Sequence, residues 1–467
     1  MTTGKDRTVF HDWRVTGELA NFILSQEGLS SLDEWGGKDV VRDILPESYR
    51  EVFDRMQPDL IDTILKEKNR TVASAFMNNV TNYVDFCEQL LNEGKPACYH
   101  YFPISLEILL ALDVVPICYE VIGGLNSALF IDGAEDAIDR LEAEGFPDHL
   151  CSTQKGTAGY LLLETIPKPD ILVKSATPCD SSNKLYEWSA VKSNAPLVML
   201  ETPYYKNERG LKFMTDEVKR FIREMEKLTG AKLDEDRLRE YCECGNQTVD
   251  YILKVQELKK IIPCPDTGWH RPADTIFMTQ IGTPMGLNYY KTLYETVKQR
   301  ADARLGVIPK DKQELRIVWG YTWQVYDLSF FEWLEQEHGA TYSVDTLTYL
   351  SPEVGFVDTT NMETMIEGLA WRLLQMPMGR QSMGFSDMWV NDFVGIAKEF
   401  KADALVIGAG VACKHFWALN KLLTDKVKDK VGIPTLKFEV DIFDKRFTPP
   451  SELRRIMDEF FYTIRSC

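Results

Sequence analysis

Short and nearly continuous apolar runs recur along the chain. Such runs are typical of strands buried on both faces of a parallel sheet, because neither face of the strand meets water. The run at 404–407, Ala-Leu-Val-Ile, is the clearest, and we expect Gly408 and Gly410 to end its strand. The predicted strands are 114–119, 171–175, 197–201, 316–319, 404–407 and 435–440.

Apolar residues at helical spacing fill much of the chain between these runs. The first long helical segment is 59–91, which we expect to end before Gly94. A later helix is expected to begin with Thr215 as its cap and to stop at Gly230. The segment 234–260 continues in the same helical pattern.

The alternation of buried strands and helices predicts the α/β class. We expect two Rossmann or flavodoxin-like parallel-sheet domains, because strands joined by helices pair in parallel. The predicted division is a helical N-terminal extension at 1–95, a first α/β domain at 96–210, a helical bridge at 211–311 and a second α/β domain at 312–467.

Three cysteines lie at junctions between predicted elements. Cys179 follows the strand 171–175, and Cys413 follows the strand 404–407, at the strand ends where open α/β sheets bind ligands. Cys151 directly precedes a helical segment. Because a helix N-terminus lowers the pKa of a thiol and stabilises anionic ligands, we interpret these three cysteines as the candidate site.

The remaining cysteines have simpler interpretations. Cys242 and Cys244 lie two residues apart on a predicted helix, so their side chains point about 200° apart and cannot readily face one metal ion. Cys242 shares the apolar face of that helix with Leu238, which predicts burial in the core. Cys98, at the entry to the first α/β domain, stays open between burial and metal binding.

The run from Gly408 to Cys413 nearly matches the G-x-G-x-x-G dinucleotide fingerprint, with a cysteine where the third glycine belongs. Glu439 or Asp441 would supply the ribose-binding acid at the end of the next strand. The match is weak, because a thiol replaces the glycine needed for close helix packing and little chain remains to complete such a domain. The sequence also contains no G-x-x-x-x-G-K-[ST] loop, so we expect no ATP site.

Charge and composition limit the partners and the cellular location that the protein can have. The net charge of −18 argues against a nucleic-acid partner, because phosphate binding needs a basic face. The longest apolar stretch, 106–125, is interrupted by acidic residues and a proline, so no membrane span is predicted. The first residues lack the apolar core of a signal peptide, and the 10 cysteines are scattered singly. We therefore expect a cytoplasmic protein with reduced thiols.

Several ordered pieces of the chain resemble the 2-hydroxyglutaryl-CoA dehydratase D-component family, which includes benzoyl-CoA reductase subunits and double-cubane cluster proteins. The resemblance covers about 95–450. The pieces are Leu-Glu-Ile-Leu at 106–109, Val-Val-Pro at 114–116, Asp-His-Leu-Cys-Ser at 148–152, Pro-Asp-Ile at 169–171, Pro-Cys-Asp at 178–180, Leu-Glu-Thr-Pro-Tyr at 200–204, Ala-Asp-Ala-Leu-Val at 402–406, Cys-Lys at 413–414, Gly-Ile-Pro at 432–434 and Glu-Val-Asp at 439–441.

By position, Cys151, Cys179 and Cys413 resemble the three ligands of a 4Fe–4S cluster in this family. Three ligands leave one iron free to take water or a substrate oxygen. The resemblance implies a heterodimer with a homologous second subunit. It also implies a separate ATP-hydrolysing iron–sulfur activator, which supplies a low-potential electron. That electron reaches the thioester of an acyl-CoA and makes a ketyl radical anion.

One segment departs from the dehydratase pattern. Where a dehydratase subunit tends to carry serines, this chain has Tyr99, His100, Tyr101 and Phe102. We predict that His100 or Tyr101 donates a hydrogen bond or a proton near the open iron. A buried aromatic cluster is the alternative interpretation. Glu107 is a further pocket candidate.

The sequence thus predicts an iron–sulfur subunit of a 2-hydroxyacyl-CoA dehydratase. Three alternatives stay open: a subunit of a benzoyl-CoA or other aromatic acyl-CoA reductase, a double-cubane cluster reductase, and a non-catalytic electron-relay subunit. The double-cubane alternative needs more cysteine ligands, of which Cys98 would be one. The identity of the acyl group and of the fourth cluster ligand also stays open.

Overall fold

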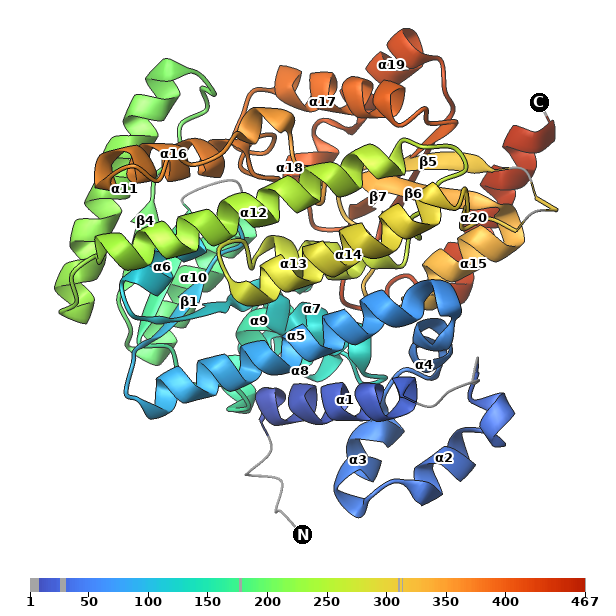
Figure 1. Ribbon diagram of the computed structural model, residues 1–467, viewed down its shortest axis with the longest axis horizontal. Helices are drawn as coiled ribbons and strands as arrows, with labels where there is room; N and C mark the ends of the chain where they lie inside the picture. Colours follow the sequence, from blue (N-terminus) through green and yellow to red (C-terminus); the bar gives the residue numbers. More distant parts are fainter. Residues whose placement is uncertain (1–7, 26–30, 176–178, 310, 313, 467) are drawn as a thin grey trace.

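The computed structural model describes residues 8–25, 31–175, 179–309, 311–312 and 314–466 (Figure 1). Across these residues the strands form two four-stranded parallel sheets. The first has the order β2-β1-β3-β4 and the second has the order β6-β5-β7-β8. The strands are β1 (Ala97–His100), β2 (Val115–Cys118), β3 (Ile171–Ser175), β4 (Leu197–Leu200), β5 (Leu315–Trp319), β6 (Ala340–Asp345), β7 (Ala404–Gly410) and β8 (Thr435–Val440).

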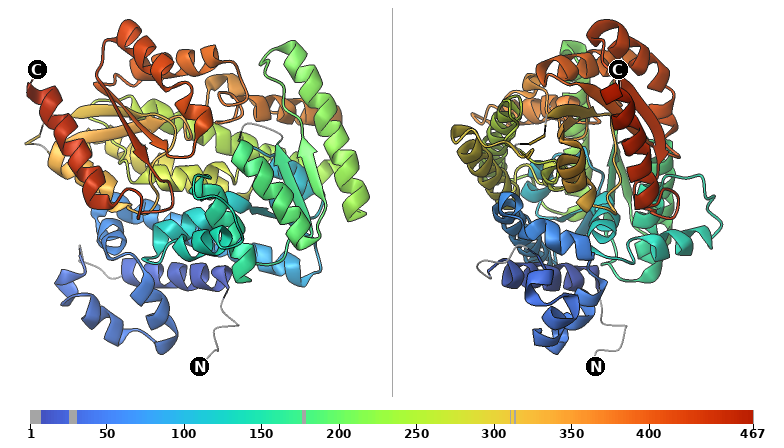
Figure 2. Two further views of the ribbon diagram at one scale, coloured as in Figure 1. Left: turned by 180° about the vertical axis from the view of Figure 1, so that it is seen from behind. Right: turned by 90° about the vertical axis from the view of Figure 1, so that its right-hand side faces the viewer.

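The predicted α/β class with two parallel sheets and a helical N-terminal region is confirmed. Figure 2 shows the two sheets in separate regions of the molecule, the first in blue to green and the second in orange to red. A continuous hydrophobic core reaches from the N-terminal helices through both sheets. The expected extension at 1–95 includes residues 1–7 and 26–30, which lie outside the described residues.

The helices cover both sheets and fill the space between them. Figure 1 shows α12 and α14 side by side across the middle of the molecule, and they pack together. The α-helices are α1 (Val9–Leu24), α2 (Lys38–Ile44), α3 (Glu47–Arg55), α4 (Pro58–Leu65), α5 (Glu67–Asn92), α6 (Leu106–Ala111), α7 (Tyr119–Leu129), α8 (Glu135–Glu142), α9 (Ser152–Leu163), α10 (Asp180–Ser193), α11 (Glu208–Thr229), α12 (Glu235–Lys259), α13 (His270–Met278), α14 (Pro284–Asp302), α15 (Ser329–His338), α16 (Met362–Gln375), α17 (Ser386–Glu399), α18 (Lys414–Trp417), α19 (Asn420–Val431) and α20 (Pro450–Ser466).

Two local predictions are wrong. The strand β7 does not end at Gly408 but continues through Gly410. Gly408 is needed inside the strand because a Cβ there would lie only 2.9 Å from the Trp319 side chain. The helix α11 begins seven residues before Thr215, where the Asn207 side chain accepts a hydrogen bond from the Gly210 amide. Thr215 therefore lies inside the helix rather than at its cap.

The helix that carries Cys151 packs very closely on its neighbour. Cys151 precedes α9, and α9 lies against α8. At Gly159 in α9, a Cβ would lie 1.9 Å from the carbonyl oxygen of Ala137 in α8. Because this is backbone contact, no side chain can move aside, and the close approach depends on glycine.

We predict that Gly159→Ala lowers the free energy of unfolding by about 1–3 kcal/mol, because the added methyl group overpacks the contact between α8 and α9. Gly395→Ala is the matched control. Gly395 also lies in a helix, α17, but a Cβ there meets nothing within 4 Å. This control should stabilise the protein by about 0.5–1 kcal/mol. Urea unfolding measures both effects, and equal shifts for the two variants would contradict the packing argument.

Candidate active site

The three cysteines singled out in the sequence line one cavity of about 470 Å³. Each thiol is carried by the residue directly before a helix: Cys151 before α9, Cys179 before α10 and Cys413 before α18. Cys151 and Cys179 belong to the half with the first sheet, and Cys413 follows β7 of the second sheet. The cavity therefore lies between the two halves, and both contribute thiols to it.

The thiols are close enough to influence one another. Burial raises the pKa of Cys151 to about 12, and the neighbouring thiols of Cys179 and Cys413 add to the rise. Burial likewise raises the pKa of Cys413 to about 11, with a smaller contribution from Cys179. A buried thiol becomes a thiolate only when a positive charge compensates it, and metal coordination provides that charge.

The spacing of these side chains also limits what they can hold. In the part of the chain that the structure describes, no group of three histidine, cysteine or acidic side chains is spaced for a single metal ion. A cluster of several irons spreads its ligand sulfurs further apart than one ion does. Three cysteines that line one cavity are a donor set of the kind that can hold an iron–sulfur cluster.

A buried carboxyl lies beside the thiols in the same cavity. Glu120, in the first turn of α7, accepts hydrogen bonds from the Gln154 amide at 3.3 Å and the Tyr186 hydroxyl at 3.2 Å. Burial raises the pKa of Glu120 to about 7, although the Lys174 ammonium opposes that rise. Glu120 can therefore hold or release a proton near neutral pH.

Lys174 completes this polar group from β3. Its side chain is fully buried, and its ammonium lies 3.6 Å from the ring centroid of Tyr101. Burial lowers the pKa of Lys174 to about 8, whereas the Glu120 carboxylate raises it. Glu120 and Lys174 thus share a dry environment in which both groups are pushed toward their neutral forms.

The three predicted pocket residues, His100, Tyr101 and Glu107, are found in three different environments. Tyr101 lines the cavity, with its ring edge-on to Tyr186 at 6.0 Å between centroids. His100 is fully buried, and its ring Nδ1 donates to the Tyr101 carbonyl at 3.0 Å. Burial lowers the pKa of His100 to about 4.

Glu107 lies in a buried ion pair outside the main cavity. Its carboxylate lies 2.6 Å from the Arg372 guanidinium and accepts a hydrogen bond from the Ser105 hydroxyl at 2.8 Å. It lines a separate space of only about 20 Å³. Of the three predicted pocket residues, the structure therefore brings only Tyr101 into the cavity that holds the thiols.

Tyr321 is a second cavity tyrosine that the sequence did not indicate. It follows β5, as Tyr101 follows β1, and its hydroxyl is close enough to the Cys413 thiol to lower the pKa of that thiol. Its ring stacks on Phe416 at 4.8 Å. The backbone φ of 74° is rare for a tyrosine, and such strain concentrates at functional sites.

The other cysteines lie away from this cavity. Among the residues that the structure describes, only Cys151, Cys179 and Cys413 contribute thiols to its lining. Cys242 is buried in α12, as predicted, and Cys98 is buried within β1. Glu120 was also missed by the sequence analysis, although one signal pointed to it: an acidic residue directly after a buried strand lies where parallel sheets bind ligands.

The match to known proteins covers most of the chain. The family model described as 2-hydroxyglutaryl-CoA dehydratase, D-component, matches residues 99–461, which include all three cavity cysteines. The chain belongs to this family. The resemblance inferred from the ordered sequence pieces is thereby confirmed.

Individual relatives are between 19% and 25% identical to this chain over the aligned residues. The alpha subunit of (R)-2-hydroxyglutaryl-CoA dehydratase from Acidaminococcus fermentans is 24% identical over 301 residues, 60% of this chain and 57% of the relative. One of the subunits of benzoyl-CoA reductase from Thauera aromatica is 25% identical over 346 residues, 69% of this chain and 78% of the relative. The lactoyl-CoA dehydratase alpha subunit from Anaerotignum propionicum is 19% identical over 364 residues, 68% of this chain and 79% of the relative.

The helices described in the structure include none with the length and apolar character needed to cross a membrane. This agrees with the interrupted apolar stretch at 106–125, which the fold divides between α6, β2 and α7. In that stretch Glu107 is buried in its ion pair and Glu120 faces the cavity.

We predict that Glu120→Gln changes how stability depends on pH. The raised pKa of Glu120 means that the folded protein keeps a proton that the unfolded chain releases between about pH 4.5 and 7. Stability of the wild type is therefore lost as the pH rises through this window, and the variant lacks that loss. Urea unfolding at pH 5, 6 and 7 should show a growing advantage for Glu120→Gln. Parallel pH curves for the two proteins would contradict the assignment.

Proposed function

We propose that this chain is the iron–sulfur subunit of a 2-hydroxyacyl-CoA dehydratase, with Cys151, Cys179 and Cys413 as the ligands of a 4Fe–4S cluster. The observation that carries the proposal is the convergence of these three thiols on one cavity. Membership of the dehydratase D-component family supports the acyl-CoA chemistry. The relatives named above are subunits of acyl-CoA dehydratases and of a benzoyl-CoA reductase.

The positions of the thiols suit an anionic cluster. Each thiol precedes a helix, and the partial positive charge at the N-termini of α9 and α10 would stabilise an anionic cluster held by Cys151 and Cys179. The hydroxyl of Tyr321 lowers the pKa of the Cys413 thiol, and polar groups close to ligand sulfurs are one way in which proteins tune cluster potentials. When bound, such a cluster supplies one low-potential electron to the thioester carbonyl of an acyl-CoA.

The protein's own groups supply the proton and the dry surroundings. Glu120 lines the cavity with a carboxyl that titrates near neutral pH, so it can give a proton to the acyl group or take one from it. Tyr101 and Tyr321 line the same cavity with hydroxyls that can donate hydrogen bonds. The apolar surroundings exclude water, which protects a reactive radical from side reactions.

A benzoyl-CoA or other aromatic acyl-CoA reductase subunit is the second candidate. It is supported by the match to the benzoyl-CoA reductase relative, which covers 78% of that protein. A double-cubane reductase is less well supported, because the cavity lining in the described chain holds no fourth cysteine and Cys98 is buried within β1. The electron-relay alternative predicts a cluster but no effect of acyl-CoA on it.

We also propose that the chain works with a homologous second subunit and a separate ATP-hydrolysing activator. The names of the relatives describe each of them as one subunit of an enzyme, which supports a multi-subunit assembly. The sequence has no phosphate-binding loop of the G-x-x-x-x-G-K-[ST] type, so ATP hydrolysis falls to a partner.

We predict that replacing Cys151, Cys179 or Cys413 singly with alanine removes most of the iron and sulfide from anaerobically purified protein, because each loss leaves two ligands. Iron and sulfide analysis with EPR of the reduced protein measures the loss. Cys242→Ala is the control, since Cys242 is equally a cysteine but is buried in α12 away from the cavity. A full complement of iron and sulfide in Cys413→Ala would refute the ligand assignment.

We further predict that the purified chain alone shows no ATP-dependent turnover of any acyl-CoA. Turnover should appear only when the second subunit and the activator are added together, because the electron source and its ATP site lie on other chains. Assays omitting one component at a time measure this dependence. Rapid ATP hydrolysis by the isolated polypeptide would contradict the proposal that the ATP site lies on another chain.

A further inference from the structure

The cavity wall beyond the thiols is apolar. Much of it is built by two helices and a loop that carry no cysteine of the site, namely α7, α13 and the segment after β8. Gly124 and Ala128 on α7 are small residues in this wall. The apolar wall residues from these elements are Val121, Gly124, Ala128, Pro272, Ile276, Ile442 and Phe443.

The cations in the lining belong to the solvent side of the cavity. Lys184 has a side chain that is 71% exposed and is paired with Glu187 at 2.9 Å. Lys414 is also exposed. No arginine is among the described residues of the lining.

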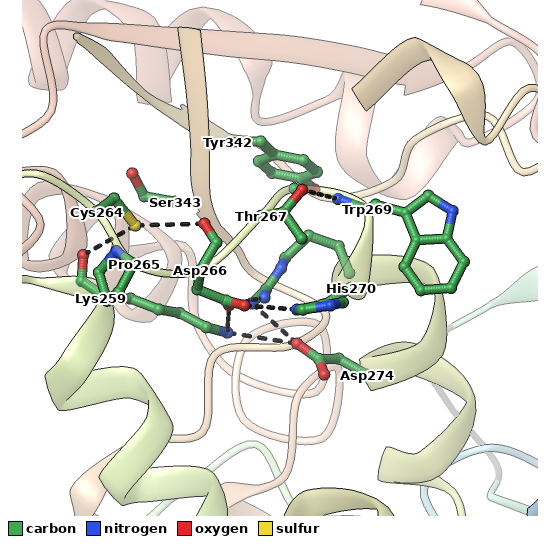
Figure 3. A network of polar contacts seen from close by, with 12 residues as sticks. Lys259, Cys264, Pro265, Asp266, Thr267, Trp269, His270, Asp274, Tyr342 and Ser343 are labelled. Atoms are coloured by element: carbon green, nitrogen blue, oxygen red, sulfur yellow. Dashed lines mark hydrogen bonds and ion pairs between the residues drawn. The ribbon is translucent and has the colours of Figure 1, made fainter. Parts of the chain in front are cut away.

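The buried charges behind α13 are engaged with one another (Figure 3). Arg271 pairs with Asp266 and, at 2.9 Å, with Asp274. Lys259 lies 3.3 Å from Asp274. Because residues four apart share one face of a helix, His270 and Asp274 lie on the face of α13 opposite Pro272 and Ile276. This network fixes the helix from behind and offers no cation to the cavity.

The inner part of the cavity carries an acidic side chain. Glu120 lines the cavity, and its partner Lys174 is held over the Tyr101 ring and donates to the Ser175 carbonyl. A second carboxylate brought into the inner part of the cavity would meet Glu120, whereas the two lysines of the lining are exposed to solvent. An unpaired carboxylate removed from water is strongly disfavoured.

We propose that the cavity takes an uncharged, apolar acyl group, aromatic or branched aliphatic, and rejects an acyl group that ends in a carboxylate. This inference deepens the function proposed above and depends on it. The cavity volume of about 470 Å³ falls in the range of small-molecule sites, so an aromatic acyl group fits.

The test compares two thioesters that differ at the far end of the acyl chain. Hexanoyl-CoA and glutaryl-CoA share the CoA moiety and have similar length, and neither carries the 2-hydroxyl group or the ring on which the proposed reactions act. Isothermal titration calorimetry on the anaerobically purified, cluster-loaded protein should give hexanoyl-CoA the tighter binding by roughly 10- to 100-fold. Equal or tighter binding of glutaryl-CoA would overturn the inference and leave the proposed function intact.

A pair of variants tests whether the wall itself causes the preference. Thr275 is half-buried on the cavity side of α13. Thr275→Lys places a cation in the wall and should reduce the preference for hexanoyl-CoA to within about threefold. Thr275→Met, of similar length without the charge, should keep it. An unchanged preference in Thr275→Lys would place the acyl group elsewhere and overturn the inference.

The failure of the proposed function would look different. If neither thioester binds and neither alters the EPR spectrum of the reduced protein, the cavity is not an acyl-CoA site, and both proposals fail together. The wild-type comparison needs no variant to fold, so the inference can be refuted even if Thr275→Lys is unstable.

Discussion

The site depends on the convergence of strand ends from two parallel sheets. In each sheet the strand order places the first and third strands side by side, and their connections leave on opposite faces, which opens a crevice at their carboxyl ends. Tyr101 follows the first strand and Cys179 the third in one sheet. Tyr321 and Cys413 follow the corresponding strands of the other. Because all four line one cavity, the two crevices face each other.

A low dielectric is the shared property of the groups at this junction. Burial raises the pKa of Cys151, Cys413 and Glu120, and it lowers the pKa of Lys174. Each group is thus pushed toward its neutral form unless an opposite charge is close. Under the proposed function, such surroundings suit the transfer of an electron and a proton to the same acyl group, because net charge would otherwise build up away from water.

The sequence was sufficient for the architecture because the sheets are buried on both faces. Apolar runs predicted β3, β5 and β7 within three residues, and the strand β8, in which polar and apolar residues alternate, was also predicted. The strand β6 was missed because Thr341, Ser343 and Asp345 alternate along it, although every residue in it is buried. Its polar groups find partners inside the protein, as when Asp345 accepts from the Tyr342 hydroxyl at 2.8 Å.

The cavity could be predicted only in part, for a similar reason. Position after a strand or before a helix identified Cys151, Cys179 and Cys413, because that signal is local. The location of Glu107 and the role of Tyr321 depend on contacts with Arg372 and Cys413, which are far away in the sequence. No periodicity records such contacts. In the sequence, Glu107 and Glu120 look alike, because each is an acidic residue within an apolar stretch. Only the fold shows that Glu107 pairs with Arg372 and that Glu120 lines the cavity.

Separate elements hold the thiols and the apolar wall. The thiols precede α9, α10 and α18, whereas the wall comes from α7, α13 and the segment after β8. Under the proposed function, substitutions in the wall can alter which acyl group fits without moving a thiol. The names of the relatives, which include glutaryl, lactoyl, phenyllactyl and benzoyl thioesters, are consistent with this division. The buried ion pairs behind α13 hold that helix in place. The residues on its cavity face can therefore change without displacing the helix.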